Sequence, residues 1–185
     1  TICYREDAVK LMLTKNIIFK NFNFKSSTKK VSNFFKEFSK EENEIINSLK
    51  KTYKDSYSIK IFKKLKRYKY VVLIGMGGSV LGSRSIYSFL QEKIKKKFFF
   101  QNSFELLKLD EKNKKDQLNL VISKSGNTLE TISNSNILIN KSNKNVFITE
   151  NKKSYLLDLA KKLKFDVIHH NNFIGGRYSV LSEVG

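Results

Sequence analysis

The sequence predicts an α/β fold: a doubly wound, mostly parallel sheet of about five strands with helices on both faces, preceded by a helical N-terminal segment. Three observations predict it. Short apolar runs alternate with amphipathic stretches from Tyr70 onward, apolar residues before Tyr70 recur at helical spacing, and 40% of the 185 residues are apolar. Continuous apolar strands that alternate with helices are typical of a parallel sheet covered on both faces. The length suits one substantial hydrophobic core rather than two.

The first region, residues 1–68, shows apolar positions separated by three and four residues, which is the period of an amphipathic helix. They are clearest at Val31, Phe34, Phe35 and Phe38, followed by Ile45, Ile46 and Leu49. We expect these residues to form a helical segment that packs on the main domain, residues 69–185.

The main domain contains the predicted strands and helices in alternation. Four buried strands are predicted at residues 70–75, 119–123, 145–149 and 166–170, with a weaker fifth at residues 104–109. Helices are predicted at residues 79–92, 128–140 and 153–164. In such a sheet, ligands bind outside the carboxyl ends of the strands, at the turns into the following helices.

The formal charge of +19 raises the possibility of nucleic-acid binding. The excess is almost all lysine, spread along the whole chain, with only four arginines. The densest runs, residues 63–69 and 93–97, flank apolar segments and are interpreted as a solvated rim. We therefore expect no nucleic-acid partner, although a basic nucleic-acid-binding protein remains an alternative.

Cellular location is indicated by cysteine usage and hydropathy. Cys3 is the only cysteine, so no internal disulfide and no cysteine-based zinc site is possible within the sequence. The apolar stretch near the N-terminus is interrupted by Lys15 and Asn16, and no run approaches the length of a membrane span. We expect a cytoplasmic protein without a membrane partner, and the missing initial Met suggests that residues precede Thr1.

One predicted strand-to-helix turn is rich in glycine: "GMGGSVLG", residues 75–82, here called the glycine turn. Glycine lets the backbone bend tightly and approach a ligand, and the N-terminus of the next helix favours anions. The dinucleotide pattern G-x-G-x-x-G fails at Val80, and the Walker A pattern fails at Ser83. The alternative is a tight turn that binds no ligand.

A second turn, "SKSGNTLET", residues 123–131, is rich in hydroxyl groups and is here called the hydroxyl loop. Asn127 is expected to cap the following helix, with Glu130 in a capping-box relation. Capping does not account for the several Ser and Thr residues, whose hydroxyls can surround a phosphate with donors. The hydroxyl loop therefore predicts a phosphate site, and Lys124 either adds charge there or points to solvent.

Together with the terminal "IGGRYSVLSEVG", residues 174–185, these turns resemble the sugar-isomerase domain of the glucose-6-phosphate isomerase family. The resemblance covers about residues 70–185. We call residues 174–185 the arginine motif, since it contains Arg177. The resemblance implies a sugar-isomerase (SIS) type fold and an aldose-ketose isomerase of glycolysis and gluconeogenesis that uses no metal or other cofactor and forms a homodimer.

The resemblance also implies roles for particular residues. Gly78 and Ser79 would contact the sugar phosphate, and Arg177 would stabilise negative charge near the reacting carbons. The remaining substrate-binding residues all lie in the hydroxyl loop: Ser123, Lys124, Ser125, Gly126, Asn127, Thr128 and Thr131. The role of Arg177 also makes physical sense, because a guanidinium keeps its proton and two glycines precede it. The alternative for Arg177 is a surface salt bridge.

Interconversion of glucose 6-phosphate and fructose 6-phosphate through an enediolate requires a base, a ring-opening acid and positive charge. The resemblance implies that the base Glu, with a His and a Lys, lies beyond Gly185. Of the residues present, a structural role is expected for His169 and His170, and Glu183 is interpreted as a carboxylate in the first turn of a helix. Alone, the chain is expected to bind hexose 6-phosphate with little or no turnover; a stand-alone regulatory domain is the alternative.

Overall fold

The computed structural model describes residues 29–105, 107 and 116–184. The chain divides into two compact units, Thr1–Glu41 and Glu42–Gly185. In the first unit, the described part contains helix α2, Lys29–Phe38, which confirms the helical spacing predicted there. Its four apolar side chains are all exposed: Val31, Phe34, Phe35 and Phe38.

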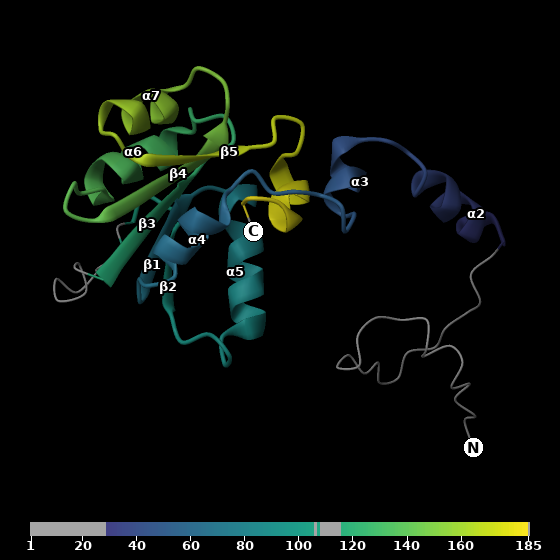
Figure 1. Cartoon of the computed structure of the whole chain (residues 1–185), viewed down its shortest axis with the longest axis horizontal. Coiled ribbons are helices and arrows are strands. Elements are labelled where there is room, and N and C mark those ends of the chain that lie inside the picture. The colour runs from purple at the N-terminus through teal and green to yellow at the C-terminus, as the bar shows by residue number, and fades with distance from the viewer. Residues whose placement is uncertain (1–28, 106, 108–115, 185) are drawn as a thin grey trace. The chain divides into compact units, whose positions relative to one another are not determined.

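The second unit contains a sheet of five parallel strands, confirming the predicted fold class (Figure 1). The strands are β1 Tyr70–Gly75, β2 Lys97–Gln101, β3 Gln117–Ile122, β4 Lys144–Glu150 and β5 Asp166–His170. They lie in the order β2-β1-β3-β4-β5, and every neighbouring pair is parallel.

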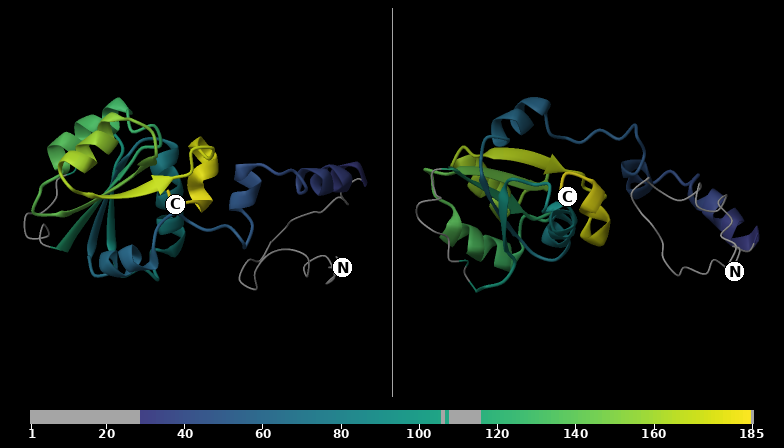
Figure 2. Two further views of the ribbon diagram at one scale, coloured as in Figure 1. Left: turned by 45° about the horizontal axis from the view of Figure 1, so that its top comes forward. Right: turned by 90° about the horizontal axis from the view of Figure 1, so that it is seen from below.

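The second unit contains α3 Glu44–Ser48, α4 Ile59–Leu65, α5 Gly78–Leu90, α6 Leu129–Leu138, α7 Tyr155–Lys162 and the short 3-10 helix η2 Gly176–Leu181. Four of these helices lie on the two faces of the sheet (Figure 2). Helices α6 and α7 cover one face, and α4 and α5 cover the other. The predicted boundary after residue 68 stays a prediction; α4 packs on the sheet through Ile61 and Leu65.

The core lies between the sheet and these two helix layers. Successive residues of a strand point to opposite faces, so Val71 and Leu73 pack towards α4 while Val72 and Ile74 pack towards α6 and α7. This is why β1 is apolar at almost every position rather than at alternate ones.

The fifth strand lies at Lys97–Gln101, so its predicted position at residues 104–109 is wrong. Its three consecutive phenylalanines suit a strand, and Phe98 and Phe100 pack with Tyr87 of α5. Beyond the strand, the Gln101 side chain binds the carbonyl oxygens of Ser103 and Glu105 and the backbone N–H of Leu107. These bonds hold Ser103, Glu105 and Leu107 around the Gln101 side chain, so these residues do not continue as a strand. Residues 106, 108 and 109 lie outside the described part.

The chain reverses direction across the sheet between β1 and β3. From β1 the chain runs through α5 to β2 at one edge, and from β3 it runs through α6 to β4 on the other side. Because β1 and β3 are neighbours, their following turns leave the same edge of the sheet and diverge to opposite faces. Such a switch point is where open α/β sheets bind ligands.

Candidate functional site

The glycine turn follows β1 and lies against the end of β3. A Cβ on Gly75 would lie 2.8 Å from the carbonyl oxygen of Ile122, so only glycine fits this approach. Gly77 has a φ of 55°, which favours glycine, and α5 begins at the next residue. The turn therefore places the N-terminus of α5 beside the end of β3. Gly78 and Ser79 are half-buried in the first turn of α5.

The arginine motif packs directly on the glycine turn and α5. A Cβ on Gly78 would lie 2.6 Å from the carbonyl carbon of Gly176, and one on Gly82 would lie 2.7 Å from Val180. The Ser83 hydroxyl donates to the carbonyl oxygen of Val184 at 2.9 Å. Segments that are far apart in the sequence therefore meet. Arg177 directly follows Gly176, which makes the contact with Gly78.

The hydroxyl loop is held by hydrogen bonds of its own. The Ser123 and Thr128 hydroxyls lie 3.0 Å apart, and the Ser123 hydroxyl also accepts from the N–H of Gly126. The Ser125 hydroxyl accepts from the N–H of Asn127. Ser123 is buried, whereas Ser125 is exposed. The loop is therefore ordered before any ligand arrives and still presents a hydroxyl to solvent.

Asn127 does not cap α6, contrary to the expectation from sequence. Thr128 occupies the N-cap position of α6 without a side-chain cap bond. The Asn127 side chain instead accepts from the N–H of Tyr155, the first residue of α7, at 2.9 Å. The carbonyl oxygen of Gly126, which has a φ of 65°, accepts a hydrogen bond from the N–H of Leu156. The tight packing of Gly126 on Ser154 brings the start of α7 within reach of Asn127.

Lys124 lies against the arginine motif rather than pointing freely to solvent. A Cβ on Gly175 would lie 3.0 Å from the Lys124 ammonium nitrogen. The carbonyl oxygen of Lys124 accepts from the Thr149 hydroxyl and from the N–H of Glu150, which anchors the loop to β4. A positive charge therefore lies between the hydroxyl loop and the arginine motif.

Two buried hydroxyls, one in the hydroxyl loop and one packed on it, lack a partner within the described part of the chain. They are Oγ1 of Thr131, in the first turn of α6, and Oγ of Ser154, which packs on Gly126. Both residues are buried, at 1% and 5% exposure. Buried polar groups are usually paired, because an unmade hydrogen bond costs about 1–3 kcal/mol.

Arg177 is exposed in η2, and no hydrogen bond or ion pair joins it to the residues that the structure describes. The alternative of a surface salt bridge is therefore not seen within that part. Gly175 and Gly176 precede it, and Gly176 has a φ of 57°. The Arg177 side chain is therefore exposed, and the residue before it packs on Gly78 of the glycine turn.

His170 and Glu183 form a buried pair beneath this segment. The His170 Nδ1 lies 3.0 Å from Oε2 of Glu183, and its Nε2 lies 2.8 Å from the carbonyl oxygen of Ile174. These contacts agree with the structural role expected of His170. His169 is exposed. Glu183 follows η2 and is not a carboxylate in the first turn of a helix, so that interpretation is wrong.

The Glu183 carboxylate is stabilised in its charged form. Burial acts to raise its pKa, but hydrogen bonds from His170, its own backbone and Ser56, together with the His170 charge, lower the pKa to about 2. The N–H of Ser56 and the hydroxyl of Tyr53 both reach Oε1, at 3.2 and 3.3 Å. Tyr53 and Ser56 are site-supporting residues that sequence reasoning missed, since more than a hundred residues separate them from Glu183 and no local pattern links them.

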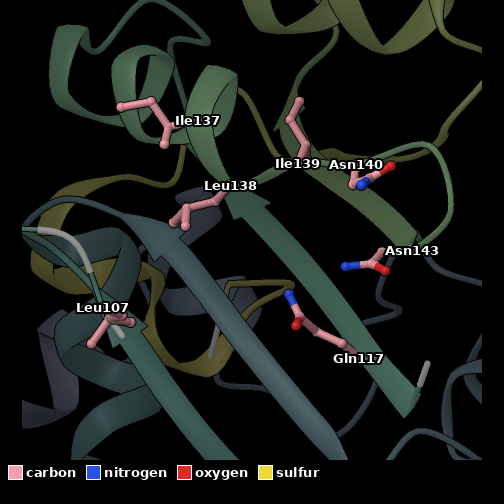
Figure 3. Close-up of a pocket in the computed structure, with 7 residues that line it drawn as sticks. All are labelled: Leu107, Gln117, Ile137, Leu138, Ile139, Asn140 and Asn143. Carbon is pink, nitrogen blue, oxygen red and sulfur yellow. The ribbon is translucent and has the colours of Figure 1, made fainter. Parts of the chain in front are cut away.

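A pocket of about 270 Å³ lies on the face of the sheet that α6 covers (Figure 3). It is lined by Leu107, Gln117, Ile137, Leu138, Ile139, Asn140 and Asn143. Gln117 begins β3, whereas the hydroxyl loop follows the last residue of the same strand. None of the lining residues belongs to the glycine turn, the hydroxyl loop or the arginine motif.

Metal and membrane features can be assessed for residues 29–105, 107 and 116–184. No group of three His, Cys, Asp or Glu side chains there is arranged to hold a metal ion. No helix in that part is both long and apolar enough to cross a bilayer.

A five-stranded parallel sheet with helices on both faces, and with a glycine-rich turn and a hydroxyl-rich turn at its switch point, defines a doubly wound α/β domain. Its sequence matches the phosphoglucose isomerase family over residues 8–185. The chain belongs to the phosphoglucose isomerase family, which confirms the resemblance noted from its motifs.

Individual relatives support the assignment. A glucose-6-phosphate isomerase of Methanocaldococcus jannaschii is 38% identical over 135 residues, covering 67% of this chain and 33% of that protein. One of Borrelia garinii is 31% identical over 139 residues, covering 65% of this chain and 26% of that protein. The chain thus spans about a quarter to a third of the length of these relatives.

Solved structures share the fold. A hypothetical protein from Thermus thermophilus superposes with a TM-score of 0.58 and 25% identity, covering 66% of this chain and 32% of that one. A candidate sugar-phosphate isomerase from Listeria monocytogenes gives a TM-score of 0.51 over 86% of both chains, at 16% identity. The second likeness shows the fold alone.

Proposed function

We propose that the chain is the phosphosugar-binding part of a glucose-6-phosphate isomerase, and that it binds hexose 6-phosphate at the switch point between β1 and β3. The observation that carries the proposal is the meeting of the glycine turn, the hydroxyl loop and the arginine motif around one edge of the sheet. Membership of the phosphoglucose isomerase family supports it.

The phosphate would be held by the hydroxyl loop and the N-terminus of α6. Ser125 presents an exposed hydroxyl, Thr128 a half-buried one, and Thr131 a buried hydroxyl without a partner in the described part. The first turn of a helix adds free N–H groups and the positive end of its dipole. Lys124 belongs to the hydroxyl loop, lies against Gly175 and supplies a full positive charge. Neutral donors and one cation suit a phosphate monoester dianion.

The sugar would extend from the phosphate towards the glycine turn and the arginine motif. Gly78 and Ser79 lie there, with the backbone of Gly176 against Gly78. Arg177 would stabilise the negative charge that develops on the enediolate oxygens, since its guanidinium cannot act as an acid and stays charged. The chain's own residues therefore supply binding and electrostatic stabilisation.

Proton transfer between C1 and C2 would use a Glu located after Gly185 in the longer protein. His170 is unsuited to this role because both of its ring nitrogens already contact Glu183 and Ile174. Ring opening and homodimer formation would likewise depend on the rest of the protein. The 185-residue chain should bind hexose 6-phosphate and convert it slowly or not at all.

Thermal unfolding of the 185-residue chain tests the proposal. Fructose 6-phosphate should raise the Tm, because a ligand that binds only the folded state stabilises it by mass action. The double substitution Ser125→Ala and Thr128→Ala should abolish the increase, and Arg177→Ala should reduce it. Ser142→Ala is the matched control, since Ser142 lies exposed in a loop at the opposite end of β4. An increase that survives the double substitution would refute the site.

A further inference from the structure

One imidazole ring, that of His170, contacts the segment that carries Arg177 on both sides of the arginine. His170 Nε2 lies 2.8 Å from the carbonyl oxygen of Ile174, which comes three residues before Arg177 in the sequence. His170 Nδ1 lies 3.0 Å from the carboxylate of Glu183, which follows η2. The His170 and Glu183 side chains are 1% and 2% exposed. We call these two residues the clasp.

The chemistry of the clasp determines its protonation. A carbonyl oxygen and a carboxylate are both acceptors, so each ring nitrogen of His170 must donate for both contacts to be hydrogen bonds. Only the imidazolium donates from both nitrogens. Glu183 is a carboxylate at neutral pH, since its pKa is about 2. The clasp therefore joins two buried side chains through the His170 ring, and its contacts fix the positions of both.

The clasp is supported from a third segment of the chain. The Tyr53 hydroxyl and the Ser56 N–H bind the other oxygen of the Glu183 carboxylate. The Ser56 hydroxyl donates to the carbonyl oxygen of His169, the residue before the ring. Both carboxylate oxygens and both ring nitrogens thus have partners, as buried polar groups require.

The Arg177 segment has little stiffness of its own. Gly175 and Gly176 precede the arginine, and η2 is a single short 3-10 helix. The guanidinium has no partner within the described residues. Its position therefore depends on contacts elsewhere: the packing of Gly176 on Gly78, the packing of Val180 on Gly82, and the clasp.

We propose that His170 and Glu183 are positioning residues that hold the backbone on both sides of Arg177, so that the guanidinium faces the reacting carbons of the bound sugar. This inference rests on the proposed function. The clasp does not touch the sugar; it acts through the segment 174–183. The phosphate group, held by the hydroxyl loop, is bound independently of it.

The test compares two probes on the 185-residue chain by nuclear magnetic resonance titration. A five-carbon sugar-acid 5-phosphate has a carboxylate that resembles the enediolate, so Arg177 should contact it. Inorganic phosphate reports the hydroxyl loop alone. Glu183→Ala should weaken the sugar acid about tenfold or more, since small misplacements of a positioned group have large effects. Its effect on inorganic phosphate should stay within about twofold.

Glu183→Gln is the conservative variant and should restore binding. Its amide oxygen can accept from Tyr53 and Ser56, while its amide N–H donates to Nδ1 of a neutral His170 that still donates to Ile174. If Glu183→Ala does not fold, Tyr53→Phe removes one hydrogen bond and keeps the contact between His170 and Glu183. It should give a smaller loss in the same direction, for the sugar acid only.

The outcomes separate the clasp from the proposed function. If the unsubstituted chain binds neither probe, the proposed function fails and the clasp proposal falls with it. If it binds both and Glu183→Ala or Tyr53→Phe leaves sugar-acid affinity unchanged, the clasp proposal alone is overturned. Equal losses for the two probes, or no recovery in Glu183→Gln, would indicate a general structural role and also overturn it.

Discussion

The backbone of Gly176 lies directly against Gly78, where a Cβ would come within 2.6 Å of the Gly176 carbonyl carbon. The contact joins the glycine turn to the arginine motif without any side chain between them. Real Cβ atoms do not approach backbone carbons this closely, and neither backbone is the flexible end of a side chain. A larger residue at position 78 must therefore push the two segments apart.

Gly78→Ala should displace η2 and lower the free energy of unfolding by about 1–3 kcal/mol, the usual cost of overpacking. Amide resonances of residues 175–179 should shift, and urea unfolding should give the energy. Gly77→Ala is the matched control: nothing lies within 4 Å of its Cβ, and only its φ of 55° is unfavourable. That variant should lose about 1–3 kcal/mol, the cost of a sparsely populated backbone conformation, and leave those resonances in place. Unshifted resonances in Gly78→Ala would contradict the contact.

Asn127→Ala should lower the free energy of unfolding by about 1 kcal/mol, the typical effect of losing a capping side chain. The reason is that its oxygen accepts from the N–H of Tyr155 at the start of α7. Asn127→Asp keeps the acceptor and should preserve most of the stability. Asn136→Ala is the control, since Asn136 makes only a 3.4 Å contact to the Tyr155 hydroxyl at an exposed site. Urea unfolding distinguishes the three, and equal values for both alanine variants would refute the cap.

Much of the fold could be predicted because β1, β3 and β4 each contain a short apolar run, and β5 a shorter one, between helical stretches. A parallel sheet places the two turns at the same edge, and the strand order, with β1 beside β3, makes them neighbours. Strand β2 was misplaced because its phenylalanines directly follow a lysine run, and because residues 104–109 are themselves apolar. The binding residues assigned from the resemblance stay predictions, although the structure brings Gly78, Lys124 and Arg177 to the same edge of the sheet.

The rest of the site could not be predicted because its contacts join distant segments. A local capping rule assigned Asn127 to its own helix, whereas the packing of Gly126 on Ser154 brings the start of another helix within reach. Glu183 looked like a helix-start carboxylate because sequence does not show that His170 lies opposite it. Spacing reports periodicity along one element and contains no information on such tertiary pairs.

Acid should destabilise the chain through Glu183. Its folded-state pKa of about 2 lies below the ordinary value of 4.5, so its contribution is fully present above about pH 4.5 and is lost as pH falls towards 2. The difference in free energy of unfolding between the unsubstituted chain and Glu183→Gln should shrink over this range, by on the order of 3 kcal/mol. Tyr53→Phe keeps the contact between His170 and Glu183 and should retain most of the pH dependence. A difference that does not change between pH 4.5 and 2 would contradict the assignment.

A ladder of buried amides at the opposite end of the sheet should affect stability but not ligand binding. Gln117 donates to Asn119 at 2.6 Å, Asn119 donates to Asn145 at 2.8 Å, and Asn145 donates to two backbone carbonyl oxygens. All three side chains are almost completely buried. Asn119→Ala leaves the Gln117 amide N–H without its acceptor and the Asn145 amide oxygen without its donor. The free energy of unfolding should therefore fall by about 2 kcal/mol or more.

The control for the ladder is Asn140→Ala, because Asn140 contributes its backbone carbonyl oxygen, which the substitution retains. The exposed Asn140 side-chain oxygen accepts from the N–H of Ser142, so the substitution should lower the free energy of unfolding by no more than about 1 kcal/mol. Both variants should keep the Tm increase caused by fructose 6-phosphate, since the ladder lies at the amino ends of β3 and β4 while the hydroxyl loop follows the carboxyl end of β3. If Asn119→Ala unfolds at the same urea concentration as the unsubstituted chain, the amides do not form the ladder. If it folds but loses the fructose 6-phosphate effect, the ligand binds at the amino ends of the strands and the switch-point site is wrong.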